Sequence, residues 1–342
     1  MAAERVLVVG GAGYLGTHIV DLLLEGGYEV RVFDSLLHGA EGVAGFAAEP
    51  GFELQVGKLT DLHAVHGALK GVDYVIHLAA IVGDPASQVD PDSTVVVNLL
   101  ATASLAHAAI NGGVKRFLFA STCSVYGFGE EEFSEQSALN PISLYARTKI
   151  ESERILLSLA SEAFHPIILR KATIFGLSYR MRFDLVVNLL SALAVRKGRI
   201  PIMGGEQWRP VLHVRDAARA YLACLRAPLE NVSGHVFNVG DSRLNFTVDD
   251  IGRVVADAVP TADIQRQAEV KDGRSYRVSF RKIHETLGYA ATIDLEDGVR
   301  EMVKALQGGQ YADFQDTRFN NFLAAKEEYY RRVLTADAPD KL

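Results

Sequence analysis

The chain has 342 residues, of which 49% are hydrophobic and 23% charged, and its formal net charge at pH 7 is −7. This composition supplies enough apolar side chains for the cores of two domains and excludes a chain that is disordered throughout. Because the charge is negative and no lysine- or arginine-rich block occurs, we expect no nucleic-acid partner.

Short apolar runs alternate with helix-length segments through the first half of the sequence. Runs that are apolar throughout are typical of parallel strands covered by helices on both faces, which predicts an α/β fold with a doubly wound parallel sheet of the Rossmann type. The first run ends after about five residues, far short of the ~20 that a membrane helix needs. We therefore expect a cytoplasmic protein with no membrane partner. The expected strands are residues 5–9, 29–34, 52–56, 74–78, 116–120 and 166–170.

The pattern changes after residue 175. A long apolar helix is expected over residues 184–196 and a short strand over 200–203. A further helix is expected over residues 321–333, and the sequence does not reveal its role. The expected units are a Rossmann domain of residues 1–175 and about 211–240, a smaller C-terminal α/β domain of residues 176–210 and about 241–306, and a tail of residues 307–342.

The first strand runs into a glycine-rich turn, GGAGYLG at residues 10–16, and an apolar helix follows directly. Glycine allows a positive φ and lets the backbone approach a pyrophosphate, whose charge is favoured by the free N–H groups at the start of a helix. The position between a strand and a helix favours this function over a tight turn with no ligand. We expect the cofactor to contact Gly10, Gly13, Tyr14, Leu15 and Gly16.

Asp34 ends the second strand, 18 residues after Gly16. A carboxylate here can accept hydrogen bonds from the adenosine ribose and would repel a 2′-phosphate. Residues 35–39 contain no Arg or Lys, so we expect the cofactor to be NAD. The alternative interpretation of Asp34 is an ordinary turn residue at the end of a strand.

A YxxxK pattern places Tyr145 and Lys149 on one face of an expected helix. Free tyrosine titrates near 10, and a lysine ammonium roughly 5 Å away, at an effective dielectric near 20, would stabilise the phenolate by about 3 kcal/mol, or ~2 pKa units. This shift would suit Tyr145 to acid/base catalysis near neutral pH. A Tyr/Lys pair on the surface is the alternative, and the position after five expected strands favours the catalytic interpretation.

Hydroxyl groups follow the fifth expected strand, where RFLFAST leads into CSVYG. Ser121, Thr122 and Ser124 thus lie at the carboxyl end of a strand, where open α/β sheets bind their ligands. One hydroxyl there can share a proton between a substrate oxygen and Tyr145. Capping of the turn is an equally good interpretation for Ser121 and Ser124.

These motifs together resemble the extended short-chain dehydrogenase/reductase family, in particular its NAD-dependent nucleotide-sugar epimerase/dehydratase branch. The resemblance covers about residues 5–300 and depends on GGAGYLG, Asp34, HLAA at residues 77–80, Asn98, ASTCSVYG, YARTK and RPVLHVRDAARA. It implies that Thr122 is the catalytic hydroxyl, that Tyr145 is the acid/base, and that Lys149 binds the nicotinamide ribose and tunes Tyr145. It places Asn98 near the active site, although helix packing is an equal alternative. Further cofactor contacts implied are Asp61, Leu62, Leu78, Ala79 and Ala80.

Two departures from the family pattern bear on the reaction and the cofactor. Family 4,6-dehydratases place Asp-Glu after the catalytic threonine and decarboxylases keep the Glu, whereas this chain has Cys123 and Ser124 there. Members that epimerise C3 and C5 place a cysteine two residues before the position of Tyr126, and Cys123 is three before it. Dehydration, decarboxylation and 3,5-epimerisation are therefore disfavoured. Lys58 stands where relatives have an acidic residue, which leaves NADP open as an alternative cofactor.

The resemblance also implies a nucleoside-diphosphate sugar as the partner of the smaller domain. Arg209 and Arg274 match arginines that resemble the family's diphosphate clamp, and the forked guanidinium suits such an anion. Taken alone, an arginine at a loop end is more often solvated or paired with a carboxylate. Further substrate candidates are Ser124, Arg180, Arg182 and Asn188.

The leading hypothesis is an NAD-dependent epimerase that acts at C4 of a nucleotide-linked hexose through a 4-keto intermediate. A 4-ketoreductase, a sugar-nucleotide dehydrogenase and a non-catalytic dinucleotide-binding regulator are the alternatives. Apolar helices at about residues 93–111 and 145–161 favour a homodimer. The histidines are scattered, and the two cysteines, Cys123 and Cys224, are far apart, so we expect neither a metal site nor a disulfide.

Overall fold

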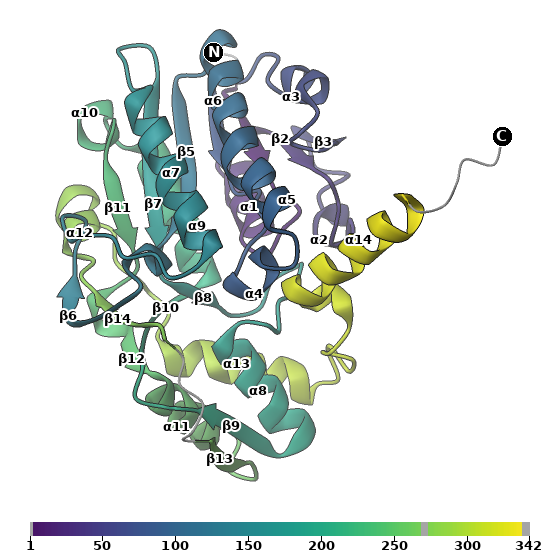
Figure 1. Cartoon of the computed structure of the whole chain (residues 1–342), viewed down its shortest axis with the longest axis vertical. Helices are drawn as coiled ribbons and strands as arrows, with labels where there is room; N and C mark the ends of the chain where they lie inside the picture. The colour runs from purple at the N-terminus through teal and green to yellow at the C-terminus, as the bar shows by residue number, and fades with distance from the viewer. Residues whose placement is uncertain (1–2, 268–272, 337–342) are drawn as a thin grey trace.

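The larger domain is built on one parallel sheet with the strand order β11-β7-β5-β4-β1-β2-β3. The computed structural model describes residues 3–267 and 273–336, so the outermost residues of the expected first domain and tail lie outside the described part. The sheet confirms the predicted fold class (Figure 1). Its strands are β1 (Arg5–Val9), β2 (Glu29–Asp34), β3 (Phe52–Val56), β4 (Tyr74–His77), β5 (Arg116–Thr122), β7 (His165–Lys171) and β11 (Val236–Val239).

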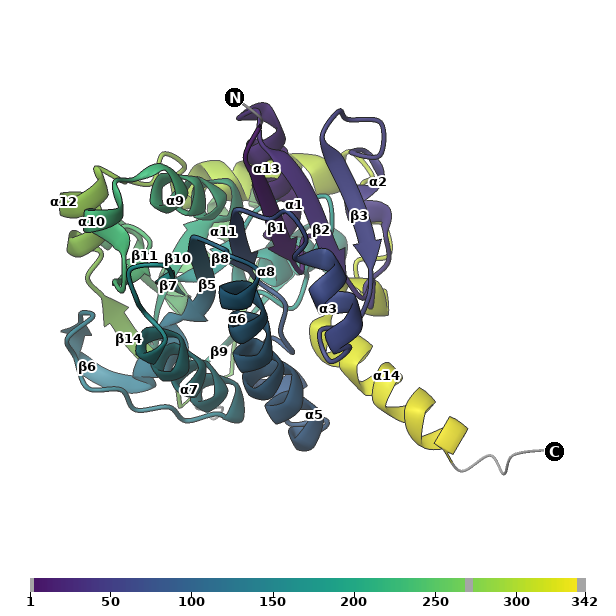
Figure 2. The ribbon, with the colours of Figure 1, turned by 90° about the horizontal axis from the view of Figure 1, so that it is seen from above.

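Helices cover both faces of this sheet (Figures 1 and 2). In β1, Val6 and Val8 belong to one hydrophobic core, whereas Leu7 and Val9 belong to another on the opposite face. Successive side chains of a strand point to opposite faces, so a strand buried on both sides must be apolar at every position. One core includes α1 (Gly16–Glu25) and α9 (Val214–Arg226); the other includes α3 (Leu62–Ala68), α6 (Ala101–Asn111) and α7 (Leu144–Ser158).

Residues Pro91–Asn111 form one long helical stretch, composed of α5 (Pro91–Val95), a π-helical turn η1 (Val96–Leu100) and α6. It is long and apolar enough to cross a membrane by those two criteria, and here its inner face packs in the core beneath the sheet. The π-helical turn carries Asn98, which is fully buried. Asn98 accepts from the Ile81 N–H at 2.8 Å and donates to the Ile81 carbonyl at 3.0 Å, so it fixes the chain that leaves β4.

The smaller domain contains short sheets and a helical layer. The expected helix over 184–196 and strand over 200–203 are observed as α8 (Val186–Lys197) and β9 (Arg199–Met203). The return to the larger domain comes at α9, since the preceding strand, β10 (Trp208–His213), pairs within the smaller domain with β8 (Thr173–Phe175) and β12 (Asn245–Thr247). The remaining paired strands are β9 with β13 (Asp263–Gln267) and β6 (Phe128–Phe133) with β14 (Ser275–Val278).

Several other helices complete the described part of the chain. Near its end the expected helix over 321–333 is observed as α14 (Asn321–Ala336), which packs against α4 (Asp84–Ser87). The others are α2 (Glu41–Ala44), η2 (Cys123–Tyr126), α10 (Leu229–Val232), η3 (Ser242–Leu244), α11 (Val248–Ala258), α12 (Arg281–Leu287), α13 (Leu295–Gln307) and η4 (Thr317–Phe319).

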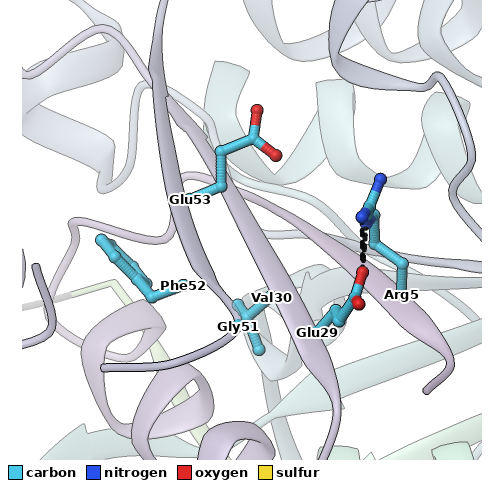
Figure 3. A pocket seen from close by; sticks show the side chains of 6 residues that line it. All are labelled: Arg5, Glu29, Val30, Gly51, Phe52 and Glu53. Carbon is cyan, nitrogen blue, oxygen red and sulfur yellow. Dashed lines mark hydrogen bonds and ion pairs between the residues drawn. The ribbon is translucent and has the colours of Figure 1, made fainter. Parts of the chain in front are cut away.

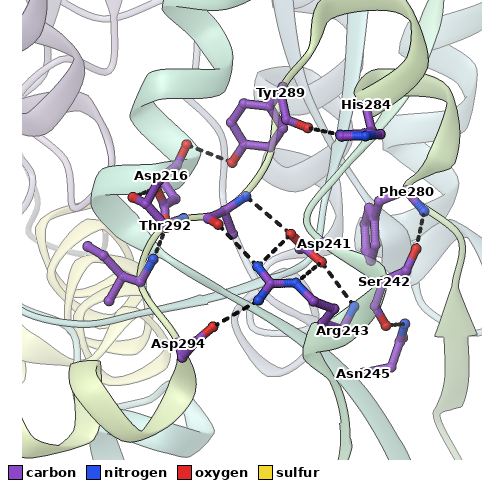
Figure 4. Close-up of polar contacts among 12 residues, drawn as sticks. Asp216, Asp241, Ser242, Arg243, Asn245, Phe280, His284, Tyr289, Thr292 and Asp294 are labelled. Carbon is purple, nitrogen blue, oxygen red and sulfur yellow. Dashed lines mark hydrogen bonds and ion pairs between the residues drawn. The ribbon is translucent and has the colours of Figure 1, made fainter.

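A buried carboxylate ties α9 to the segment that precedes α13 (Figure 4). Asp216 is fully buried and accepts from the backbone N–H groups of Thr292 at 3.0 Å and Ile293 at 2.9 Å. The Tyr289 hydroxyl donates to the Asp216 carbonyl at 2.9 Å. Because a buried carboxylate is tolerated only when its oxygens are paired, this network fixes the smaller domain against a helix of the larger one.

Candidate active site

A cavity of about 1580 Å³ opens at the carboxyl ends of the parallel strands. Residues that follow β1, β2, β4, β5 and β7 form one side of it, and residues of the smaller domain form the other. Open parallel sheets bind ligands where the strand order reverses, which here lies between β1 and β4. Since pockets for one small ligand measure roughly 300–1,000 Å³, this cavity has room for a dinucleotide and a second ligand.

A second pocket, of about 230 Å³, lies at the opposite, amino-terminal ends of β1, β2 and β3 (Figure 3). Arg5 forms an ion pair with Glu29 there, and Glu53 accepts from Arg31 at 2.8 Å. Its charged side chains thus pair with one another. We find in it no arrangement that suggests a ligand.

The glycine-rich turn has no room for side chains at its two ends. Gly10 has a φ of +84°, and a Cβ atom on it would lie 2.6 Å from the backbone nitrogen of Ala79. A Cβ atom on Gly16 would lie 2.5 Å from the carbonyl oxygen of Gly10. The turn therefore presents backbone at the start of α1, which suits a pyrophosphate. The predicted cofactor contacts that line the cavity here are Gly10, Gly13, Tyr14, Leu15, Gly16, Leu78, Ala79 and Ala80.

Asp34 lines the same part of the cavity. Its carboxylate accepts from the N–H groups of Ala12 at 3.0 Å and Leu36 at 2.9 Å, and these bonds leave lone pairs for ribose hydroxyls. Burial raises the pKa of Asp34, while the two backbone bonds and the nearby Arg180 lower it. The glycine-rich turn thus suits the diphosphate, and the Asp34 carboxylate suits the hydroxyls of the adenosine ribose.

The structure does not bring Asp61 and Leu62 to the cavity. Asp61 caps α3, with its carboxylate accepting from the backbone N–H groups of His63 and Ala64 at 3.0 and 3.1 Å. The Leu62 side chain is 53% exposed. Lys58 and Leu59, just upstream, line the cavity instead. The sequence did not reveal that Asp61 caps a helix, which is why it did not show that the carboxylate is already bonded to backbone.

Thr122, Tyr145 and Lys149 all line the cavity, at the end of β5 and along the first turns of α7. The Thr122 side chain lowers the pKa of the Tyr145 hydroxyl. The Lys149 ammonium lies 5.9 Å from the centre of the Tyr145 ring and 4.6 Å from that of Phe119. The helix that carries both residues starts at Ser143, whose hydroxyl accepts from the Ala146 N–H at 3.1 Å.

The charges around Tyr145 differ from the expected ones. Burial raises the pKa of Tyr145 and the Asp84 carboxylate raises it further, whereas Arg182 and the Thr122 side chain lower it. Burial lowers the pKa of Lys149 to about 7, and repulsion from Lys171 adds to this. Arg182 is thus a cation that lowers the pKa of Tyr145, an effect that the sequence did not reveal, whereas the expected effect of Lys149 on Tyr145 stays a prediction.

Arg182 keeps its charge because Asp184 pairs with it. The guanidinium donates to the two carboxylate oxygens of Asp184 at 3.0 and 2.8 Å, in the forked geometry that arginine favours. Both residues line the cavity and are largely buried. The sequence identified Arg182 only as a substrate candidate, because the 36 residues between it and Tyr145 hide the effect of its charge on that residue.

Lys171 also lines the cavity, a position that sequence reasoning missed. It ends β7, pairs in register with Thr122, and donates to the carbonyl of Ser121 at 2.7 Å. Burial lowers its pKa to about 8. A charged residue at the carboxyl end of an otherwise apolar strand was the available signal.

Ser121 and Ser124, whose roles were left open, have different surroundings in the structure. Ser121 is fully buried, and its hydroxyl donates to Glu153, which also forms a buried ion pair with Arg170 at 2.6 Å. Ser124 lines the cavity, and its hydroxyl lies 3.4 Å from that of Tyr276. Ser121 also lines the cavity, but its hydroxyl is bonded to Glu153, so the Ser124 hydroxyl is the better placed of the two to meet a ligand.

Arg209 and Arg274 reach the cavity from the smaller domain. Arg209 donates to the Arg274 carbonyl at 2.7 Å and lies over the ring of Tyr276. The Arg274 guanidinium donates to Asp84 at 2.9 Å, and Asp84 also accepts from the Ser143 hydroxyl at 2.6 Å. Two guanidinium groups thus converge at the end of the cavity that holds Tyr145.

The other two substrate candidates lie elsewhere. Arg180 lines the cavity at the cofactor end, where its charge acts on Asp34. Asn188 is fully buried, accepts from the Gly176 N–H at 3.0 Å and donates to the Tyr14 hydroxyl at 3.1 Å. It therefore fixes the glycine-rich turn against the chain after β8 and does not line the cavity.

Comparisons with known proteins agree with this site. The model of the NAD dependent epimerase/dehydratase family matches residues 6–240. A dTDP-glucose 4,6-dehydratase from Actinoplanes sp. is 31% identical over 319 residues, which cover 87% of this chain and 96% of that relative.

Two solved structures are similar over nearly the whole chain. The UDP-glucose 4-epimerase of Thermotoga maritima with UDP-glucose has a TM-score of 0.77 and 26% identity, covering 90% of this chain and 99% of that one. MoeE5 in complex with UDP-glucuronic acid and NAD has a TM-score of 0.79 and 27% identity, covering 90% of this chain and 100% of that one. The neighbours therefore include nucleotide-sugar proteins with NAD bound.

Proposed function

The chain belongs to the NAD-dependent epimerase/dehydratase family, and from that membership we propose that it inverts C4 of a nucleotide-linked hexose through a 4-keto intermediate. The observation that carries this proposal is that Thr122, Tyr145 and Lys149 together line one end of a cavity large enough for cofactor and sugar. The two residues that follow Thr122 in the sequence supply no carboxylate. Cys123 is buried with its thiol donating to the Arg170 carbonyl, and Ser124 offers only a hydroxyl.

Acid/base chemistry at one oxygen is what these side chains provide. NAD, when bound, supplies the hydride acceptor and donor for C4. Tyr145, as phenolate, takes the proton of the C4 hydroxyl and returns it at the end, while Thr122 orients the same oxygen. Arg182 favours the phenolate by its charge. A positioned acid/base of this kind contributes about 10²–10⁴-fold to a rate.

The arginines of the smaller domain suit the role of an anchor. A 4-keto sugar must turn its other face to the cofactor without leaving, so its nucleotide has to stay bound. Arg209 and Arg274 converge on the cavity and are joined to each other by a hydrogen bond of 2.7 Å. We assign them the diphosphate, because forked guanidinium groups match its oxygens.

One experiment separates the proposed reaction from its alternatives. Purified protein is denatured to identify any released cofactor, and is assayed against UDP-, dTDP-, GDP- and CDP-sugars with and without added NADH. Formation of a C4 isomer without net change in NADH is the expected result. Stoichiometric consumption of NADH would instead indicate a ketoreductase, and formation of a dehydrated sugar a 4,6-dehydratase.

We further propose a homodimer in which α6 and α7 pack across a two-fold axis. Val96 and Leu100, which precede α6, are 41% and 55% exposed, which leaves apolar surface for a partner to cover. Sedimentation at micromolar concentration is expected to give twice the chain mass. A single species of the chain mass would contradict the proposal.

A further inference from the structure

The segment after α13 forms part of the wall of the cavity. The residues that do so lie in η4, in α14 and between them. In Figures 1 and 2, the far end of α14 extends away from the body of the protein, while the helix packs against α4 and belongs to neither core. Residues 317–332 are called the arm. The lining residues are Thr317, Arg318, Asn320, Asn321, Phe322, Ala324, Glu327, Glu328, Arg331 and Arg332.

The start of this arm is bound firmly to the segment that carries Arg180 and Asp184. The Arg180 guanidinium donates to the Arg318 carbonyl at 3.1 Å and to the Asn321 side chain at 3.0 Å. The backbone N–H of Asn321 donates to Asp184 at 3.2 Å, and the N–H of Phe183 donates to the Phe319 carbonyl at 2.9 Å. These contacts are largely buried, so this end of the arm is held firmly in place.

The far end of the arm is held by a weaker contact. Arg332 donates to Asp90 at 2.7 Å and to the Ser93 hydroxyl at 3.1 Å. The Arg332 side chain is 46% exposed and that of Asp90 is 21% exposed. Exposed ion pairs of this kind contribute little to stability. The arm thus spans the cavity between a firm contact at Asn321 and a weak one at Arg332.

The part of the cavity that the arm borders is the cofactor end. Arg180 contacts the arm and acts electrostatically on Asp34, whose carboxylate faces the adenosine ribose in the proposed function. Leu37 and Phe322 both line the cavity and are 46% and 37% exposed. Exposed apolar side chains at a ligand site are typically covered by a flat apolar group such as a nucleobase.

We propose that residues 317–332 are the outer wall of the dinucleotide site and that the contact of Arg332 with Asp90 holds this wall closed over the adenosine end of NAD. The inference rests on the proposed use of NAD and adds a role to a segment that the reaction does not employ. An epimerase must keep its cofactor from the first hydride transfer to the second, since a 4-keto sugar left with oxidised cofactor cannot be reduced. A wall that opens slowly serves that need.

The test measures how fast the cofactor leaves. Protein loaded with NADH is mixed with a large excess of NAD, and the loss of bound NADH fluorescence gives the release rate. Arg332→Ala is expected to release NADH about two- to fivefold faster, which corresponds to the loss of one partly exposed ion pair. Arg332→Lys, which keeps the charge, is expected to release it at nearly the wild-type rate.

A matched control is Arg300→Ala, which removes another exposed Arg/Asp pair, with Asp297 on α13, and does not line the cavity. It is expected to leave the release rate unchanged. A chain that ends at residue 316 is expected to release NADH faster than Arg332→Ala. Circular dichroism and the thermal midpoint show whether each variant is folded.

The inference is overturned if folded Arg332→Ala and the shortened chain both release NADH at the wild-type rate. It is also overturned if the shortened chain changes only the oligomeric state, because α14 would then be an interface between copies. Isomerisation of a sugar nucleotide together with either result would leave the proposed function intact. Failure of the full chain to bind NADH at all would instead reject the proposed function, and the inference with it.

Discussion

The two ends of the cavity are lined by different kinds of group. At the cofactor end the turn at Gly10 and the chain after β4 present backbone, and Asp34 and Arg180 are charged side chains beside it. At the reacting end it meets side chains, and the charged groups of Lys149, Lys171 and Arg182 act on one another or on Tyr145. Backbone positions fix geometry, whereas side-chain charges set proton affinity.

This difference predicts how each end responds to change. A side chain added at Gly10 or Gly16 acts by steric overlap, because its Cβ atom would lie 2.5–2.6 Å from a backbone atom. A substitution at the reacting end acts through pKa values, because the groups there are buried and coupled.

Tyr145→Phe tests whether the reacting end depends on one proton carrier. Removal of the hydroxyl is expected to lower turnover by about 10²–10⁴-fold, the usual contribution of a general acid/base. Bound NAD, measured after denaturation, is expected to stay at the wild-type level because the ring remains. Turnover within tenfold of wild type would show that another group moves the proton.

Gly10→Ala tests whether the cofactor end depends on backbone approach. The added Cβ would lie 2.6 Å from the Ala79 nitrogen at a positive φ, so the turn must shift. Overpacking of this kind costs about 1–3 kcal/mol, and we expect NAD affinity to fall about ten- to a hundredfold. Gly27→Ala is the matched control, since Gly27 has a similar φ of +79°, its Cβ would meet nothing within 4 Å, and it does not line the cavity. Equal affinities of the two variants in an NAD titration would refute the role of Gly10.

Arg182→Met tests which cation acts on Tyr145. Arg182 lowers the pKa of Tyr145, so its removal raises that pKa and moves the rise of kcat/KM to higher pH. Opposite charges within a few ångströms shift a pKa by about one unit or more, and we expect a shift of that size. Arg182→Lys keeps the charge and is expected to retain most of the wild-type profile. If the pH profile of kcat/KM is unshifted in Arg182→Met, Arg182 does not lower the pKa of Tyr145, and Lys149 is then the expected cation.

The smallest effect concerns stability and pH. Burial lowers the pKa of Lys149 to about 7 from its ordinary 10.5, so between these values the unfolded chain binds more protons than the folded one. Stability of the cofactor-free protein therefore rises with pH in this window, and below pH 7 the full cost of the buried ammonium remains. Lys149→Met is expected to flatten this rise in denaturant titrations at pH 7 and 9. The same slope in Lys149→Met and in the exposed-site control Lys304→Met would contradict the assignment.

The ends of the cavity also differ in how well the sequence predicted them. The first five strands and the turn at residues 10–16 were predicted within a few residues, because apolar runs and glycine spacing are local signals. The roles of Thr122, Tyr145 and Lys149 stay predictions, although all three line one cavity. Asp61, Leu62 and Asn188 do not line this cavity, and their placement depended on side-chain direction, which spacing does not encode.

The sequence by itself determined the sheet, the glycine-rich turn and the family, since each is written in contiguous residues whose periodicity follows from backbone geometry. Only the tertiary structure decided that Arg182 lies beside Tyr145, that Lys171 repels Lys149 and that α14 borders the cofactor end. Those facts join residues far apart along the chain. Proton affinity in a buried site depends on distance and desolvation, and both exist only once the chain has folded.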